Sequence, residues 1–264
     1  MTDKDTLQDD LLLGRVQSLV RAFGILDVLA KGGSLTLREL ALAVDLPRST
    51  AHRLLTTMEA LRYVAFDRRT NRWAIGVQAF TVGAVFAQSR DLGHLGRSIM
   101  RSLATELQHC VNIAVPEGSG ICYVDQAAVD GYRQTAARPG AVLPLHTTAS
   151  GKMMMSHWSR FELDRYLDRV PLRARTARSI VETSGLRQEL ARVRERGFAT
   201  DDEEHDQGLR CVAAMVFDRL GTPRGALSIS DRASILGRER LVELGSTVVD
   251  AARQITSQMD PRFG

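Results

Sequence analysis

The chain has 264 residues, of which 44% are apolar and 25% charged, a balance typical of a globular protein with one large domain or two smaller ones. No run approaches the roughly 20 apolar residues of a membrane-spanning helix, and the acidic, polar N-terminus is unlike a secretory signal. Three scattered cysteines, Cys110, Cys122 and Cys211, argue against a disulfide framework and a zinc site, so we expect a reduced, cytoplasmic protein without a metal.

Charge is unevenly distributed along the chain, whose formal net charge is +4. The first 14 residues carry one Lys and four Asp, and we predict a flexible tail over residues 1–14. Residues 15–76 carry ten Arg and Lys against five Asp and Glu, so the positive charge is concentrated there. Neutralisation of nucleic-acid phosphates requires such a concentration.

The basic segment opens with two predicted helices. The first runs from Gln17 to Lys31, and the side chains expected to cover a core are Leu19, Val20, Phe23, Leu26 and Ala30. The second runs from Thr36 to Val44. Thr36 is placed to cap this helix, and Glu39, three residues later, completes a capping-box pattern. Residues 45–47 then form a tight turn.

A third helix is predicted from Pro47 to Arg62. Its apolar stripe consists of Ala51, Leu54, Leu55, Met58 and Leu61. The opposite face is polar, and a polar helix directly after such a turn is the one that enters the DNA major groove in helix-turn-helix proteins. The candidate DNA-contacting residues on this helix are Arg48, Ser49, Thr50, His52, Arg53 and Thr56.

These residue types suit DNA for separate reasons. Arginine can grip guanine at two atoms, and hydroxyls reach base edges or phosphates. Arg48 and Thr50 lie at the helix N-terminus, where free backbone amides attract phosphate.

Two short predicted strands, 64–66 and 73–75, flank a polar turn over 67–72. This pattern indicates a β-wing, and we expect Arg68 and Arg69, together with Arg72, to lie along phosphates or in the minor groove. The helices and the wing together predict a winged helix-turn-helix DNA-binding domain over 15–76. The alternative is a small helical domain with a solvated basic face.

The remainder of the chain alternates between helical and strand patterns. An apolar, helix-compatible segment predicts a linker helix over 77–91, packed on both sides or against a partner subunit. Further helices are predicted over 92–107, 148–156, 160–168, 183–196 and 238–259. Strands are predicted over 110–115, 121–127, 134–138, 211–217 and 225–230. Hairpins mixed with helices predict an α+β domain with a mostly antiparallel sheet over 92–260.

Four segments of the chain resemble the IclR family of bacterial transcriptional regulators. They are LPRSTAHRLLTTMEALRYV, PLHTTASGKMM, RGFATDDEEHDQGLRCVAA and GALSISDRASIL. The third is the most specific, because the acidic run 201–204 precedes Gly-Leu-Arg-Cys at 208–211. The four matches stand in the family's order, and the likeness extends from Val16 to about Met259.

The resemblance implies an architecture and a function. It implies a winged helix-turn-helix domain, a linker helix and a GAF-like effector-binding domain. It also implies homodimers, often paired into homotetramers, on palindromic operators in double-stranded DNA. It further implies regulation of small catabolic operons, as repressor or activator, with effectors that are usually small organic acids or aromatic acids. What is typical of the family favours a repressor, and an activator is the alternative.

The family's effector-binding positions correspond here to Ala149, Ser150, Gly151, Asp201, Cys211, Ser228 and Ser230. These residue types suit a short oxo- or hydroxy-acid. Amides at a helix N-terminus bind carboxylates, and serines two apart on a strand offer hydroxyls on one face. Cys211 serves equally well as a small core residue, and only one member of the acidic run need face the ligand.

An enzyme is the rival class of protein. The chain has six histidines and several serines, but it contains no Gly-x-Ser-x-Gly elbow and no His-Glu-x-x-His. The pair Gly151-Lys152 hints at a phosphate loop, yet His146 stands where that motif needs its first glycine. We therefore predict no catalysis and no cofactor. The polar face of the third helix argues against a further alternative, an adaptor that has lost DNA binding.

Overall fold

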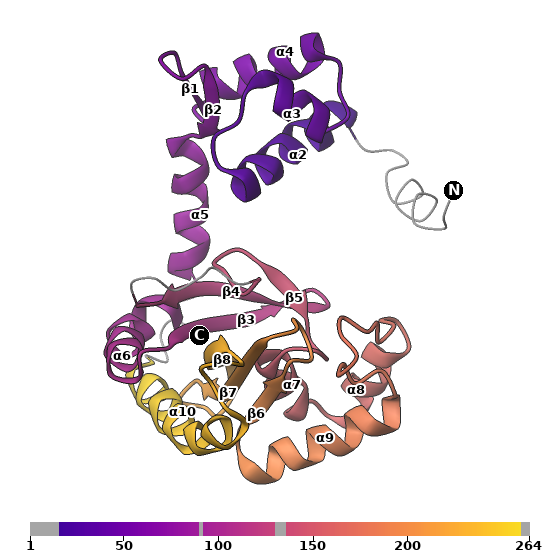
Figure 1. Cartoon of the computed structure of the whole chain (residues 1–264), viewed down its shortest axis with the longest axis vertical. Helices are drawn as coiled ribbons and strands as arrows, with labels where there is room; N and C mark the ends of the chain where they lie inside the picture. The colour runs from indigo at the N-terminus through magenta and orange to yellow at the C-terminus, as the bar shows by residue number, and fades with distance from the viewer. Residues whose placement is uncertain (1–15, 90–91, 130–135, 260–264) are drawn as a thin grey trace. The chain divides into compact units, whose positions relative to one another are not determined.

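The computed structural model describes residues 16–89, 92–129 and 136–259 (Figure 1). The chain divides into two compact units, with the boundary between Phe86 and Ala87. The predicted tail over 1–14 lies outside the described residues. Among the described helices, none has both the length and the hydrophobicity that crossing a bilayer requires.

The described part of the first unit forms a small helical bundle and a hairpin, followed by the helix α5 (Val77–Ser89). Its elements are α2 (Gln17–Gly32), α3 (Leu37–Ala43), α4 (Arg48–Ala60), β1 (Val64–Asp67) and β2 (Arg72–Ile75). Thr36 caps α3 in the predicted capping box: its Oγ1 accepts from the Glu39 N–H at 3.3 Å, and its own N–H donates to Glu39 Oε2 at 2.8 Å. The predicted start of this helix is thereby confirmed.

The core of the first unit contradicts part of the sequence prediction for α2. Leu19 and Phe23 are 56% and 60% exposed, whereas Ile25 and Leu29 are buried against the other helices. Two apolar stripes wind around α2, and only packing decides which of them the bundle covers. Leu61 of the third predicted helix is also exposed, because α4 ends at Ala60 and Leu61 follows it.

The second unit is built on a six-stranded antiparallel sheet in the order β5-β4-β3-β8-β7-β6. Its strands are β3 (Cys110–Glu117), β4 (Gly120–Ala127), β5 (Val142–Pro144), β6 (Ala199–Asp202), β7 (Leu209–Phe217) and β8 (Pro223–Arg232). Its helices are α6 (Leu92–Leu107), α7 (Ala149–Ser156), α8 (Arg160–Leu167), α9 (Thr183–Arg196) and α10 (Arg238–Gln258). The predicted α+β class with a mostly antiparallel sheet is confirmed.

The two edge strands were not predicted. β5 and β6 have three and four residues, too few to show an alternating pattern. The strand predicted over 134–138 is wrong for residues 136–138, which form a bend and irregular chain before the turn at Gly140. Its first two residues, 134 and 135, lie outside the described residues.

Helices cover both faces of the sheet (Figure 1). Successive residues of β7 alternate between the faces: Val212 and Ala214 pack with α6 and α10, whereas Ala213 and Met215 pack with α7. Because both faces are covered, β7 and β8 are buried along most of their length. A polar side chain on the sheet face covered by α7 is therefore unusual and is a candidate for a functional role.

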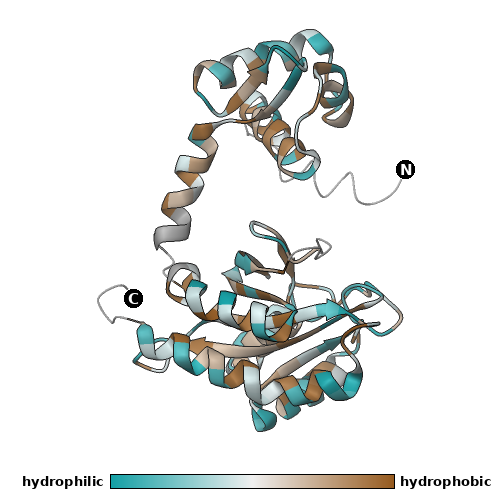
Figure 2. Ribbon diagram, turned by 60° about the vertical axis from the view of Figure 1, so that its left-hand side comes forward, coloured by the Kyte–Doolittle hydropathy of each residue, from teal (hydrophilic) through white to brown (hydrophobic). Residues whose placement is uncertain are grey.

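The helix α5 (Val77–Ser89) follows the wing and carries unpaired apolar surface. Its large hydrophobic side chains Val77, Phe80, Val82 and Val85 are between 52% and 73% exposed. Much of α5 is accordingly brown in the hydropathy view of Figure 2.

Candidate DNA-binding surface and effector cavity

The predicted DNA-contacting side chains lie along one face of α4. Arg48, Ser49, His52, Arg53 and Thr56 are exposed, and Thr50 is half-buried. The opposite face is anchored by Ala51, Leu55 and Met58, which are all buried. Because the helical repeat separates these two sets, the core fixes α4 in place while its polar face stays open.

The hydroxyl of Thr56 has its proton engaged within the helix. Thr56 Oγ1 donates to the His52 carbonyl at 2.8 Å, as Thr57 Oγ1 does to the Arg53 carbonyl at 2.9 Å. With this hydrogen bond intact, Thr56 is an acceptor, suited to an amino group of adenine or cytosine or to a thymine methyl contact.

The wing presents Arg68 and Arg69 at its exposed tip between β1 and β2. Asp67 holds the turn by accepting from the Arg69 N–H at 2.9 Å and from Thr70 Oγ1 at 2.7 Å. Arg72 has a different position from the one expected. Its Nη1 donates to the Ser34 carbonyl at 2.7 Å and lies 3.7 Å from Glu39 Oε2, so it braces the wing against the start of α3.

A second candidate site lies in the second unit, where α7 begins over one end of the sheet. A narrow cavity lies there, with a free volume of about 10 Å³, room for about one water molecule. Its lining residues are Asn112, Tyr123, Ala137, Leu143, Thr148, Ala149, Asp201, His205, Leu209, Cys211 and Ser230. Residues from β3, β4, β5, β6, β7 and β8 thus meet at the N-terminus of one helix.

The structure brings together four of the seven predicted effector positions. Ala149, Asp201, Cys211 and Ser230 line the cavity, and Cys211 is the register partner of Ser230. The other three, Ser150, Gly151 and Ser228, are buried nearby and do not line it.

The hydroxyls of Ser150 and Ser228 have no hydrogen bond of normal geometry among the described residues. Ser228 nevertheless lies close enough to favour a Cys211 thiolate, although burial outweighs that effect and raises the pKa of the thiol. Cys211 is therefore a neutral thiol and a poor nucleophile.

Asp201 contributes a carboxyl group to the lining of the cavity. Its Oδ1 accepts from the Glu204 N–H at 2.7 Å and from the His205 N–H at 3.3 Å. Burial, and secondly the nearby Glu204 carboxylate, raise the pKa of Asp201 to about 7. Near neutral pH this carboxyl group is therefore poised to donate to a ligand as an acid or to accept as a carboxylate.

Lys152 is fully buried, and its charge is already matched. Its Nζ lies 2.5 Å from Glu204 Oε1, on the loop that also carries the Asp201 hydrogen bonds. Burial raises the pKa of Glu204, and Lys152 opposes that rise. The lysine therefore ties α7 to this loop and does not line the cavity.

Sequence reasoning missed three polar residues of the cavity. Tyr123 is buried, and burial raises the pKa of its phenol well above the ordinary value, so it stays a neutral donor. His205 Nδ1 lies 2.9 Å from Thr147 Oγ1, and its buried Nε2 has no hydrogen-bond partner among the residues that the structure describes. Burial lowers the pKa of the ring. Asn112 interrupts the apolar run of β3, and that interruption was the available signal.

The role of Gly151 is set by packing against the backbone. A Cβ added there would lie 2.3 Å from the Leu145 carbonyl oxygen and 2.4 Å from its Cα. Gly151→Ala is therefore expected to destabilise the second unit by about 1–3 kcal/mol, measured as a fall in its thermal unfolding midpoint. The control is Gly185→Ala in α9, where the nearest side-chain atom would be 3.5 Å away. Equal midpoints for the two variants would contradict this role.

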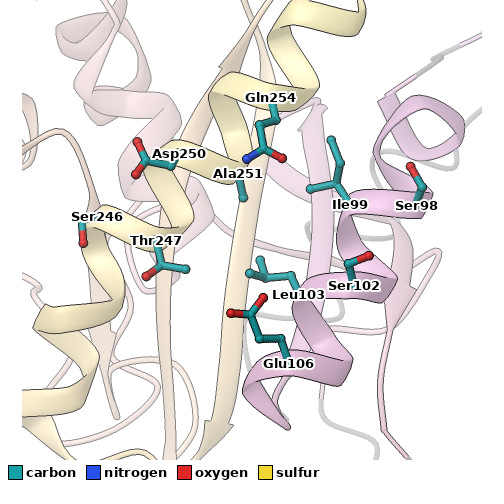
Figure 3. A pocket seen from close by; sticks show the side chains of 10 residues that line it. All are labelled: Ser98, Ile99, Ser102, Leu103, Glu106, Ser246, Thr247, Asp250, Ala251 and Gln254. Atoms are coloured by element: carbon teal, nitrogen blue, oxygen red, sulfur yellow. The ribbon is translucent and has the colours of Figure 1, made fainter.

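A larger hollow of about 410 Å³ lies between α6 and α10. Figure 3 shows Ser102 and Glu106 on α6 across from Thr247 and Asp250 on α10. None of the predicted effector positions lines it. Among the described residues, no group of three or more His, Cys, Asp and Glu side chains is arranged to hold a metal ion.

Family models match both units of the chain. A model described as the IclR helix-turn-helix domain matches residues 18–68. A second, described as bacterial transcriptional regulator IclR C-terminal, matches residues 84–257.

Individual relatives match nearly the whole chain. The transcriptional repressor IclR of Escherichia coli (strain K12) and the acetate operon repressor of Salmonella typhimurium are each 39% identical over 246 residues, covering 92% of this chain and 90% of theirs. The crystal structure of the Thermotoga maritima IclR aligns with a TM-score of 0.79 at 25% identity, covering 93% of this chain and 99% of that one. An IclR homolog from Microbacterium hydrocarbonoxydans, complexed with 4-hydroxybenzoate, has the same fold, with a TM-score of 0.77 at 19% identity over 92% and 98% of the two chains.

Proposed function

Because the chain belongs to the IclR family of bacterial transcriptional regulators, we propose that it represses a small catabolic operon by binding a palindromic operator through α4. The observation that carries this proposal is the exposed polar face of α4 on a buried helical core. The family and its curated relatives are regulators, which excludes the enzyme alternative. Repression is supported by the names of the two 39% identical relatives, and activation is the second possibility.

The proposed effector is a short oxo- or hydroxy-acid bound in this cavity, which must widen to admit it. The first turn of α7 supplies backbone amides for a carboxylate, and Ser230, Tyr123 and Asp201 supply groups for a keto or hydroxyl oxygen. The bound 4-hydroxybenzoate of the Microbacterium homolog supports an organic acid as the class of ligand.

The proposed assembly is a homodimer, with pairing of dimers into a tetramer as its extension. The exposed apolar side chains Leu19 and Phe23 on α2, together with Phe80 and Val85 on α5, supply surface that a second copy would cover. A dimer would place two α4 helices in major grooves about one turn, roughly 10 bp, apart or a multiple of that. Effector binding would then favour one spacing or assembly over another. Such a regulator acts in the cytoplasm, where its operator lies.

The experiment that tests this function is selection of bound duplexes from a random library with purified protein, repeated at two salt concentrations. Enrichment of a palindrome, with affinity that falls steeply as salt rises, is expected. The enriched duplex then becomes the probe for release by short acids. No enrichment at either salt, with or without a panel of short oxo- and hydroxy-acids, would contradict the proposal.

A further inference from the structure

The second unit contains another hollow, at the opposite end of α7 from the effector cavity. Its volume is about 480 Å³. The effector cavity touches Ala149 in the first turn of α7, whereas this hollow touches Met153 and the C-cap His157. The two hollows share no lining residue among the described ones.

The sheet leaves an open edge at this place. β6 pairs with β7 only from Asp202↔Arg210 to Ala199↔Ala213. Residues 214–217 of β7 therefore have no described strand on that side, and the hollow lies against them. The Phe217 N–H is satisfied there by Thr256 Oγ1 of α10, at 3.1 Å.

Basic side chains surround the hollow without acidic ones. His157, Arg194 and Arg253 line it, and its lining includes no carboxylate. Arg194 is held in place because its Nε and Nη2 donate to the Ser156 carbonyl at 2.9 and 2.6 Å. Arg253 is exposed, and its one described ion pair is with Asp250, one turn earlier on α10 and outside the hollow.

The floor of the hollow is apolar. Met153, Met215, Phe217 and Val249 contribute to it, and the His157 ring contacts Phe217 edge-on with centroids 5.2 Å apart. The groove between α6 and α10 differs in charge, since Glu106 and Asp250 line it. Of these two open hollows, only the one beside Phe217 joins an apolar floor to a basic rim.

We propose that this hollow is a second small-molecule site, which binds an organic monocarboxylate with a flat apolar body. The apolar body lies on Met215 and Phe217, and the carboxylate is bound by Arg253 and Arg194. A ligand there contacts the last turn of α7, whose first turn lies at the effector cavity, so the two ligands act on one helix. Binding at this site requires neither DNA nor a particular effector, so it can be tested separately from the proposed function.

The proposal is tested by direct binding of 4-fluorobenzoate to the full chain, followed through the ¹⁹F line width up to about 10 mM, the weak range expected for so small a probe. The test variant is Arg253→Glu. Its matched control is Arg240→Glu, because both arginines are exposed on α10 and each forms an i,i+3 pair with an acid, Asp250 or Glu243. Thermal unfolding of both variants checks that the fold is retained.

The expected result is roughly fivefold weaker binding by Arg253→Glu, since charge reversal replaces an attraction by a repulsion, with wild-type affinity in Arg240→Glu. Absence of binding to the wild-type chain would overturn the proposal. Binding that is equal in Arg253→Glu and in the wild type would also overturn it, because the probe would then occupy the effector cavity or another site.

Discussion

Replacement of Arg53 by alanine is expected to weaken operator binding roughly 5- to 140-fold for each α4 helix engaged, the effect of losing about 1–3 kcal/mol of base contact. Arg53 lies on the exposed polar face of α4, together with His52 and Thr56. Since the side chain is exposed, its removal should leave the fold intact to within about 0.5 kcal/mol. The measurement is a titration of the selected duplex and of a random duplex at one salt concentration.

Comparison of the two duplexes separates the contribution of specific base contacts from that of nonspecific attraction to the phosphates. Arg21→Ala is the matched control, because it removes one positive charge from an exposed position on α2 of the same unit. We expect this control to bind both duplexes nearly as the wild type does. If Arg53→Ala and Arg21→Ala lowered operator affinity equally, α4 would not be the recognition helix.

Replacement of Asp201 by asparagine is expected to stabilise the effector-free protein at pH 8.5 by on the order of 4 kcal/mol. The pKa of Asp201 is raised from 3.8 to about 7 in the folded state, so the native protein holds a proton that the unfolded chain releases. The free energy of unfolding therefore falls as the pH rises from about 4 to about 7, and above that range the whole of this loss is present. Asparagine removes this cost and keeps an oxygen for the Glu204 and His205 N–H groups.

The measurement is calorimetric unfolding of wild type and variant at pH 5 and pH 8.5, with the larger difference at pH 8.5. Asp202→Asn is the control of opposite sign. Although its partial burial alone would raise the pKa of Asp202, Arg210, Arg238 and Arg178 lower it. The ionised Asp202 therefore stabilises the fold above the pKa that it has in the unfolded chain, and this stabilisation is lost as the pH falls. Asp202→Asn should accordingly destabilise the protein at pH 8.5. An Asp201→Asn variant whose gain is the same at both pH values would contradict the raised pKa.

Local patterns in the sequence were enough to predict the helix that carries the proposed DNA-binding surface. The capping box of Thr36 and Glu39 and the helical spacing of Ala51, Leu55 and Met58 are interactions between residues within a few positions of one another. Such short-range preferences act before any distant contact forms, so the helix α4 and its polar face could be predicted. The wing followed in the same way from its two short strands.

The sequence, through its family motifs, identified only part of the lining of the effector cavity. Ala149, Asp201, Cys211 and Ser230 came from family motifs, whereas Asn112, Tyr123 and His205 were missed because three separate segments of the chain supply them. Lys152 follows a glycine, a pattern that suggested a phosphate-binding loop. Its partner in the structure is Glu204, 52 residues away in the chain. No local pattern contains such a pairing.

By itself the sequence determined the succession of helices and most strands, the polar face of α4 and the family. The reason is that propensity, capping and motif order are properties of neighbouring residues. Tertiary structure alone decided which apolar stripe of α2 is buried, that Arg72 braces the wing and that Asp201 titrates near neutral pH. Burial and electrostatic interaction depend on groups that lie near one another in space but far apart along the chain. They are therefore defined only once the sheet register and the helix packing bring those groups together.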